Sequence, residues 1–326
     1  MTFPGGGASR ARADRFVVEA LAGQQIVVSR AVVQRLFEDG LVTRDGRPLK
    51  SSAELKPGDS LLVDASPAPP STLAPDPSMS IDVVFEDADL IVVHKPAGVV
   101  VHPAKSHREH TLIQGLLARG GFDAETLEDC ARPGVVHRLD KGTSGLLVVA
   151  KTVRARDHLK ALFQAHTIDR EYVALVVGEA DSRTYDTAHG RHERDRKRFT
   201  SMHPAGLAKR AITHVQVAER LLGLTLVQCR LETGRTHQIR VHLAERSRTP
   251  VLGDPMYGAQ PGDPFLRALA EGLGHQALHA RVLGFTHPRT GTTLRFERPP
   301  PDDFQRALEA ARERPTKPST SRGPST

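Results

Sequence analysis

Cysteine and long apolar segments are scarce in this 326-residue sequence. Neither of its two cysteines, Cys130 and Cys229, belongs to a Cys-x-x-Cys pair, which argues against a zinc site or a redox motif. We expect both to be small core or surface residues. No stretch approaches the roughly 18–20 apolar residues that cross a membrane. Residues 1–13 lack the apolar segment of a signal peptide, so we expect a cytoplasmic protein.

What the chain does contain is enough apolar residues for a core and an excess of positive charge. Apolar residues make up 39% and charged residues 25% of the chain, over a length that suits about two domains. The formal net charge is +7 and the isoelectric point is about 9.7. Because Lys and Arg neutralise phosphates and release condensed counterions, this excess favours a polyanionic partner such as nucleic acid.

The first 80 residues divide into three segments by composition. Residues 1–13 are rich in Gly, Ser and Arg and are predicted to form a disordered tail. Residues 14–63 are predicted to form a small domain of two helices and a β-ribbon, because apolar residues recur at helical spacing before a turn-forming Asp-Gly pair. Residues 64–80 are rich in proline and are predicted to be a semi-rigid linker.

From residue 81 the pattern changes to short apolar runs that alternate as strands do. Strands outnumber helices and are often hairpin-like, so residues 81–305 are predicted to form an α+β domain. It would hold a largely antiparallel, mixed sheet flanked by helices. Residues 314–326 are predicted to be a second disordered tail. Strands are predicted within residues 81–98, 146–150, 171–178, 224–232, 277–285 and 292–299, and an amphipathic helix within 153–167.

The densest group of reactive side chains is HRLDKGTSG at residues 137–145. An apolar strand is predicted to end just before Asp140, and the glycine-containing turn that follows would hold this carboxylate toward a cleft. Arg138 would lie on the same side of the extended strand. A partly buried carboxylate needs a cationic partner to stay ionised. From the pattern alone, Asp140 is either a functional carboxylate or a turn residue that caps its own loop.

Several segments match one enzyme family in the same order. VVHRLDKGTSGLLVVAKT at 135–152 resembles the signature of the RluA/RluD family of pseudouridine synthases. The basic segment GRHERDRKR at 190–198 is similar to the RluD-type branch. The resemblance covers nearly all of residues 81–300 and implies a catalytic domain there. The other matching segments are HKPAGVVVHPA at 94–104, TGRTHQIRVHL at 233–243, GDPMYG at 253–258 and QALHARVLGFTHP at 276–288.

The resemblance implies roles for four side chains. Asp140 matches the catalytic carboxylate, which attacks either the anomeric carbon of the ribose or C6 of the uracil in covalent catalysis. Tyr172 matches a tyrosine that lies against the target base, and Arg235 matches the basic residue that pairs with the aspartate and keeps it ionised. Arg138 matches the arginine that fills the gap left by an extruded base. Since only bonds within the uridine are exchanged, the resemblance implies no cofactor and no metal.

Without the resemblance, other interpretations of these residues remain open. Tyr172 would be a half-buried aromatic residue on a sheet, and Arg235 a phosphate-binding or surface arginine. A hydrolase with paired carboxylates would need an acidic partner for Asp140, and Glu232 and Asp254 are only loosely placed for it.

Histidine and serine residues in these motifs also invite metal or nucleophile chemistry. His237 and His242 are five residues apart and would not share a helix face, so we expect structural or RNA-contact roles for them. Ser144 lacks a Gly-x-Ser-x-Gly elbow and is predicted to shape its turn.

Two basic regions are predicted to bind RNA phosphates. One is the segment 190–198, whose alternative is a solvated charged loop. The other lies in residues 28–63, which are similar to the RNA-binding module named after ribosomal protein S-four; its alternative is a protein-binding domain. Residues 14–16 depart from the usual start of that module. The expected RNA-binding residues are Arg30, Arg35, Arg44, Arg47, Lys50, Arg138, Arg191, Arg196, Lys197 and Arg198.

Together these features predict a pseudouridine synthase that acts on large-subunit (23S) ribosomal RNA. It would work as a monomer, because no heptad or large apolar stripe is visible. A tRNA pseudouridine synthase is an alternative, although the N-terminal module argues mildly against it. A non-catalytic RNA-binding factor of ribosome assembly is another, and the presence of Asp140, Tyr172 and Arg235 together argues against it.

Overall fold

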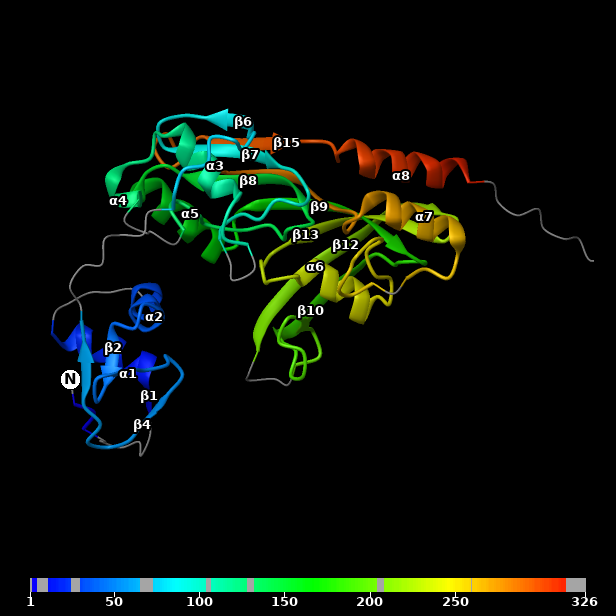
Figure 1. Cartoon of the computed structure of the whole chain (residues 1–326). Coiled ribbons are helices and arrows are strands. Elements are labelled where there is room, and N and C mark those ends of the chain that lie inside the picture. Colours follow the sequence, from blue (N-terminus) through cyan, green and yellow to red (C-terminus); the bar gives the residue numbers. More distant parts are fainter. Residues whose placement is uncertain are drawn as a thin grey trace, which may run out of the picture. The chain divides into compact units, whose positions relative to one another are not determined.

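The chain divides between residues 72 and 73 (Figure 1). This division lies inside the predicted linker at 64–80, and residues 73–80 belong to the larger unit. There the amide of Asp76 donates to the carbonyl of Gln114 at 2.9 Å, so the predicted linker is too long at its C-terminal end. The computed structural model describes residues 2–4, 11–24, 30–64, 73–103, 107–127, 132–203, 208–258 and 260–314.

The smaller unit contains the two predicted helices and the predicted ribbon. Apolar residues at helical spacing in the first helix bury Val17 and Leu21, which belong to the same core cluster as Phe37 of the second helix. The ribbon is an antiparallel sheet in the order β3-β2-β5. The elements are α1 (Ala13–Gly23), α2 (Arg30–Glu38), β2 (Val42–Arg44), β3 (Arg47–Pro48) and β5 (Leu61–Val63).

The predicted tail at residues 1–13 is wrong for the residues that the structure describes. Phe3 is buried and packs edge-on against Phe16, with ring centroids 5.3 Å apart. Strand β1 (Ala11–Arg12) pairs with β4 (Glu54–Leu55). The buried ring of Phe3 and the pairing of β1 account for the order of the described residues, 2–4 and 11–13.

The larger unit is built on a ten-stranded sheet in its described residues, with the path β11-β10-β12-β13-β9-β14-β8-β7-β6 and β15 paired to β14. Among these strands only β14 and β8 run parallel, so the prediction of a largely antiparallel sheet is confirmed. The strands are β6 (Asp82–Glu86), β7 (Leu90–Lys95), β8 (Ser144–Ala150), β9 (Asp169–Val177), β10 (Arg183–Arg191), β11 (Phe199–Thr200), β12 (Lys209–Leu221), β13 (Leu224–Leu231), β14 (Leu278–Thr286) and β15 (Thr293–Glu297).

Helices flank this sheet at both ends. Figure 1 shows α3, α4 and α5 near β7 and β8, and α6 and α7 near β12 and β13. None of the described helices is long and apolar enough to span a membrane. The last helix continues to residue 313 with Phe304 buried, so the larger unit extends beyond the predicted boundary at 305. The helices are α3 (Leu112–Arg119), α4 (Ala124–Leu127), α5 (Val153–Gln164), α6 (Gln238–Val241), the π-helix η1 (His242–Arg246), α7 (Pro264–Leu273) and α8 (Asp302–Glu313).

The strand predicted just before Asp140 is not formed. Residues 136–140 are irregular, and Val135 makes a single bridge to Val149. The amide of Val148 on β8 donates to Nε2 of His137 at 3.0 Å. The His137 side chain, and not a backbone carbonyl, accepts the hydrogen bond from this amide of β8. Residues 136–140 therefore do not pair with β8 as a regular strand.

Candidate active site

Asp140 lies in the tight loop that leads into β8. The amide of Thr143 donates to the Asp140 carbonyl at 3.1 Å and closes the turn. Gly145 has φ of +121°, and a Cβ there would lie 2.3 Å from the Ala280 carbonyl oxygen on β14. A glycine is therefore required where the loop enters the sheet, because no other residue fits both the backbone angle and the space.

A pocket opens beside this loop, over the middle of the large sheet. Its walls come from the Asp140 loop, from β9, β13 and β14, and from the turn and helix that follow β13. The predicted residues Arg138, Asp140, Tyr172 and Arg235 all line it. The sequence therefore identified the wall residues of one pocket, although these residues lie up to about a hundred positions apart. The remaining lining residues are Leu139, Thr143, Leu231, His237, Gln238, Ile239, Arg240 and Leu278.

The cationic partner of Asp140 is Arg240, and not Arg235 as predicted. Nη1 of Arg240 donates to Oδ2 of Asp140 at 2.9 Å. The other edge of the guanidinium donates to Asp254, from Nε to Oδ2 at 2.7 Å and from Nη2 to Oδ1 at 2.8 Å. The Asp254 side chain is fully buried and that of Asp140 is 15% exposed. One buried arginine therefore joins a buried carboxylate to a carboxylate that faces the pocket.

The ionisation of this triad is set by opposing effects. Burial acts to lower the pKa of Arg240, but the hydrogen bonds and charges of Asp254 and Asp140 raise it overall. Burial acts to raise the pKa of Asp254, and Arg240 lowers it below its usual range. Arg240 and Asp254 therefore stay charged near neutral pH, and Asp140 lies beside a permanent cation.

Arg235 and Arg240 belong to the same motif, TGRTHQIR, and sequence alone did not distinguish them. Arg235 makes a hydrogen bond from Nε to the Arg210 carbonyl at 3.2 Å, at the wall of the pocket. Arg240 is carried inward by α6, where only 5% of its side chain is exposed. The acidic residue Asp254 in the motif GDPMYG is the sequence feature that could have distinguished them, because it pairs with Arg240.

Tyr172 and Arg138 occupy different depths of the pocket. Tyr172 on β9 is 8% exposed, and burial raises the pKa of its phenol, which therefore stays protonated at neutral pH. Arg138 is exposed, two residues before Asp140. The pocket thus has an aromatic residue in its interior and a cation near its mouth.

Lys95 lies beneath the Asp140 loop and was not singled out from the sequence. Its side chain is fully buried, and Nζ donates to the carbonyls of Pro96 at 2.7 Å, Val99 at 2.8 Å and Lys141 at 3.3 Å. Burial lowers its pKa to about 7, while the charge of Asp140 acts to raise it. Three carbonyl acceptors match the three hydrogens of an ammonium group, so Lys95 ties the 95–99 segment to the residue after Asp140.

The two histidines of the TGRTHQIRVHL motif do not share a site. His237 lines the pocket, with Nε2 at 3.8 Å from Oδ1 of Asp140. His242 is fully buried, with hydrogen bonds of 2.9 Å to Thr213 and 2.8 Å to Thr187. Burial lowers the pKa of His242 to about 4, so it is a neutral residue of the interior.

Ser144 is buried and its hydroxyl is 2.9 Å from Nδ1 of His279. Nε2 of the same ring is 3.0 Å from the carbonyl of Arg298. This chain of contacts links β8 to β14 and the segment after β15, inside the protein. Ser144 is the first residue of β8, and its hydroxyl contacts another strand and not the turn that it was predicted to shape.

The predicted basic segment forms the connection between β10 and β11. Arg191 stacks over Phe199 at 5.0 Å, and Arg198 over Tyr257 at 5.2 Å. Arg196 and Lys197 are exposed. Two of the predicted cations are therefore held against aromatic rings, whereas the other two are open to solvent.

The predicted RNA-binding residues of the smaller unit are partly described. Arg44 pairs with Asp59 at 2.8 Å, and Arg47 and Lys50 are exposed. The side chains of Arg30 and Arg35 lie outside the described residues, as does Cys130. Cys229 is buried in the larger unit, and burial raises its pKa to about 12, so this thiol is not reactive.

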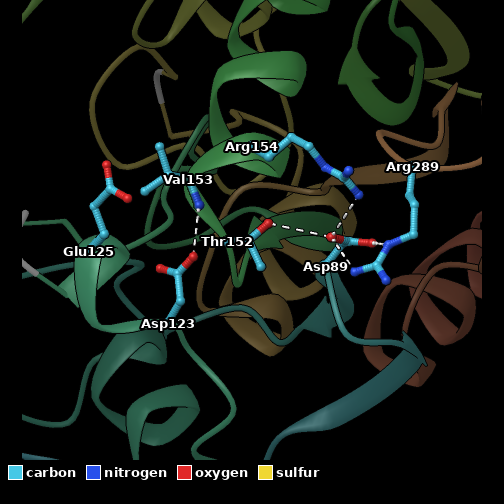
Figure 2. Close-up of a pocket in the computed structure, with 7 residues that line it drawn as sticks. All are labelled: Asp89, Asp123, Glu125, Thr152, Val153, Arg154 and Arg289. Atoms are coloured by element: carbon cyan, nitrogen blue, oxygen red, sulfur yellow. Dashed lines mark hydrogen bonds and ion pairs between the residues drawn. The ribbon is translucent and has the colours of Figure 1, made fainter.

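A second pocket of the larger unit surrounds Asp89 (Figure 2). The Asp89 carboxylate is 4% exposed and accepts from Nε of Arg289 at 2.6 Å and from Nη2 at 2.9 Å. Arg154 lies 3.5 Å from Oδ1. Both oxygens are therefore occupied by guanidinium groups, which lower the pKa of this carboxyl against the effect of burial.

Three residues of this region, Asp87, Asp89 and His287, bring potential metal-ligand atoms within 4.8 Å of one another. Nε2 of His287 is bonded to Asp87 at 2.7 Å, and Nδ1 accepts the amides of Arg289 and Thr290 at 3.2 Å each. With Asp89 held by Arg289, the atoms that a metal ion would need already have protein partners.

Comparison with known proteins shows which family this chain belongs to. Residues 89–245 match the family model described as RNA pseudouridylate synthase. The Bacillus subtilis protein "Uncharacterized RNA pseudouridine synthase YlyB" is 41% identical over 303 residues, which cover 92% of this chain and 94% of that protein. "Ribosomal large subunit pseudouridine synthase D" of Neisseria meningitidis is 40% identical over 289 residues, which cover 87% of this chain and 75% of that protein.

A solved structure agrees with these matches. "Human RNA Pseudouridylate Synthase Domain Containing 1" superimposes with a TM-score of 0.54 at 25% identity, over 74% of this chain and 98% of that one. The fold and the matches define a pseudouridine synthase, an isomerase that acts on RNA. Within this class the chain belongs to the RluA/RluD family.

Proposed function

We propose that this enzyme converts uridine to pseudouridine in large-subunit ribosomal RNA, with Asp140 as its catalytic carboxylate. The observation that carries the assignment of Asp140 is the asymmetry of its two oxygens. Oδ2 accepts from Arg240 at 2.9 Å, whereas Oδ1 of this pocket-lining residue has no hydrogen bond among the described residues. A carboxylate oxygen that is oriented and free of donors suits a nucleophile.

The reaction needs only bonds within the uridine. The glycosidic bond from the ribose anomeric carbon to N1 breaks, and a bond from the same carbon to C5 forms. C5 loses its hydrogen to water as a proton, and N1 gains a proton. Oδ1 of Asp140 starts this exchange by attacking either the anomeric carbon or C6 of the uracil. No oxidant, metal or cofactor is needed to balance the reaction.

The other pocket residues fit the handling of a base. The ring of Tyr172 offers a surface for the uracil at the interior wall, and its protonated phenol is a hydrogen-bond donor. Arg138, exposed near the mouth, would take the place that the extruded uridine leaves in the RNA. Arg235 would contribute to the electrostatics of the pocket wall, while Arg240 fixes Oδ2 of Asp140 by its hydrogen bond.

Two exposed basic regions support RNA as the substrate. The loop between β10 and β11 presents Arg196 and Lys197 to solvent, and the ribbon of the smaller unit presents Arg47 and Lys50. We infer that the smaller unit is the S-four-like module and that both regions bind RNA phosphates. The choice of ribosomal RNA rests on the relatives named ribosomal large subunit pseudouridine synthase D.

Mapping pseudouridines in a deletion strain tests the substrate. Loss of one or more sites in large-subunit ribosomal RNA, restored by the wild-type gene but not by an Asp140→Asn copy, is the expected result. An unchanged ribosomal map with lost tRNA sites would contradict the proposed substrate. Size-exclusion chromatography with light scattering tests the accompanying proposal that the enzyme is a monomer.

A further inference from the structure

His237 holds a place beside Asp140 that its backbone does not favour. It has φ of +59°, in the left-handed region that non-glycine residues rarely adopt. Hydrogen bonds around it keep this conformation, since Gln238 accepts from the Arg235 amide at 3.0 Å and from the Thr233 hydroxyl at 2.7 Å. Asparagine also suits this region of backbone angles, so His237→Asn can remove the ring without disturbing the backbone.

The ring of His237 is bonded to Tyr257 of the segment GDPMYG. Nδ1 of His237 is 2.8 Å from the Tyr257 hydroxyl oxygen. The same oxygen accepts the amide of Phe199 at 2.8 Å. Among the described residues, Nδ1 of His237 is the one acceptor within hydrogen-bond distance of the phenol hydrogen. The phenol therefore donates to Nδ1, and the hydrogen of a neutral imidazole must then be on Nε2.

The ring of His237 is neutral under working conditions. Burial lowers its pKa below the ordinary value, and the nearby charge of Asp140 offsets this only in part. With Nδ1 as acceptor, Nε2–H points toward Oδ1 of Asp140, 3.8 Å away. This is too long for a hydrogen bond. Hydrogen bonds of catalytic groups are often long before the substrate is bound and shorten in the complex.

We propose that Tyr257 fixes His237 in its Nε2–H form and that His237 thereby positions the open oxygen of Asp140 for attack. Arg240 determines where Oδ2 lies, and His237 determines the direction of Oδ1, so the carboxylate is held from both sides. His237 is a positioning residue in this account. The inference rests on the proposed role of Asp140, but the state of the His237 ring is measurable without any reaction.

The Tyr257 contact also connects Asp140 to the basic loop. Phe199 is the first residue of β11, directly after the basic segment 190–198, and its amide donates to the same Tyr257 hydroxyl that is bonded to His237. Glu245 fixes the next residues by accepting from the Thr200 hydroxyl at 3.0 Å and from the Ser201 amide at 2.7 Å. The hydroxyl of Tyr257 is therefore held by rigid elements on both sides.

The first test is long-range ¹H–¹⁵N spectroscopy of the protein labelled at histidine, with His237 assigned by its loss in His237→Asn. We expect the wild-type ring to be in the Nε2–H form at pH 7. In Tyr257→Phe we expect a mixture of tautomers, because Nδ1 has lost its donor. A wild-type ring with the hydrogen on Nδ1, or a charged ring at pH 7, would overturn the proposal.

The second test compares single-turnover rates on the RNA that wild type modifies. It uses His237→Asn, His237→Gln and Tyr257→Phe, with Tyr185→Phe as the control. His237→Asn keeps a residue suited to positive φ but cannot reach Asp140, and we expect its rate to fall at least about tenfold. His237→Gln retains a donor at the distance of Nε2 and should recover part of this loss, with Tyr257→Phe intermediate. RNA affinity should stay within about twofold throughout.

Tyr185→Phe is the matched control. It removes a hydroxyl from another tyrosine of the larger unit, 6% exposed, for which the described residues show no hydrogen bond. We expect its rate to equal that of wild type. A His237→Asn enzyme with the wild-type rate would refute the positioning role. A wild type with no activity on any RNA would instead refute the proposed function and leave the ring state to decide the present inference.

Discussion

Asp140 and Asp89 are two carboxylates of the larger unit that both face a pocket and both pair with arginine, yet they differ in the freedom of their oxygens. Both oxygens of Asp89 are taken by Arg289, and Arg154 adds a second guanidinium. Asp140 gives one oxygen to Arg240 and keeps the other toward its pocket. Figure 2 shows both oxygens of Asp89 in contact with guanidinium groups, so this carboxylate has charge around it but no open oxygen.

This difference shows which feature identifies a reactive carboxylate. Low exposure and an arginine partner are common to both carboxylates. What separates them is an oxygen of Asp140 to which none of the described residues donates a hydrogen bond. The arginines differ correspondingly, since the Arg240 side chain is 5% exposed and also holds the buried Asp254, whereas that of Arg289 is 54% exposed.

The largest effect on stability should come from the arginines of the two sites. Arg240→Met leaves the buried Asp254 without its cation, which costs about 3–5 kcal/mol, and we expect turnover to be lost with it. Arg289→Met leaves Asp89 with Arg154 as its nearby cation and should cost about 1–2 kcal/mol. Urea unfolding and turnover of both variants measure this contrast. Equal destabilisation by the two substitutions would remove the distinction between the sites.

Arg138 and Arg154 extend the comparison to the mouths of the pockets. Arg138→Ala should slow turnover by about 10- to 100-fold, because extruding a base costs a few kcal/mol and the arginine offsets part of that cost. RNA affinity should be mostly retained. Arg154→Ala, beside Asp89, should change neither quantity. Filter binding and single-turnover rates distinguish these outcomes, and an equal loss of binding and turnover in Arg138→Ala would contradict its role.

The basic loop should affect binding and leave the chemistry intact. Arg196→Ala and Lys197→Ala remove phosphate contacts, so each should weaken RNA binding and lower the slope of log affinity against log salt by about 1. Lys160→Ala, an exposed lysine of α5, is the control that we expect to bind as wild type does. An affinity that stays flat between low and moderate salt in wild type would argue against phosphate contacts altogether.

A further effect, which depends on pH, is expected on the acid side of the stability profile. Burial lowers the pKa of His242 and of His279 to about 4, from an ordinary value near 6.5. Below pH ~6.5 the unfolded chain binds protons at these residues and the folded chain does not, so stability falls as the pH drops from about 6.5 toward 4. The hydrogen bonds from Arg289 hold the pKa of Asp89 below its ordinary value, so this ion pair is intact in the same pH window.

Thermal melts at several pH values test this dependence of stability on pH. Wild type and Asp89→Asn should lose stability in parallel between about pH 6.5 and 5. Asp89→Asn should differ from wild type by a constant offset only. A melting temperature of wild type that does not change across this window would contradict neutral, buried histidines.

The fold was predictable where local pattern decides it. Alternating apolar residues gave strands that are present as β9, β13, β14 and β15, and helical spacing gave α1 and α5. The order of the strands was not predictable, because β8 pairs with β14 across more than a hundred residues of sequence. Such a pairing depends on tertiary packing that no local pattern encodes.

The sequence predicted several residues that line the pocket, but it did not predict which of them form hydrogen bonds with one another. The motif around Asp140 pointed to the right loop, but TGRTHQIR contains two arginines, and only the turn of α6 decides that Arg240 reaches the carboxylate. Lys95 was missed because a fully buried lysine is rare and its three carbonyl acceptors come from two separate loops. His237 was noted but its bond to Tyr257 joins segments 20 residues apart.

Tritium release from C5 of uridine tests the central claim most directly. Large-subunit ribosomal RNA transcribed with uridine tritiated at C5 would be incubated with wild type, Asp140→Asn and Asp89→Asn. Forming the new carbon–carbon bond expels that hydrogen into water. We predict release by wild type and by Asp89→Asn, and a rate for Asp140→Asn reduced by at least about 10³-fold. Release by Asp140→Asn at the wild-type rate would contradict the account.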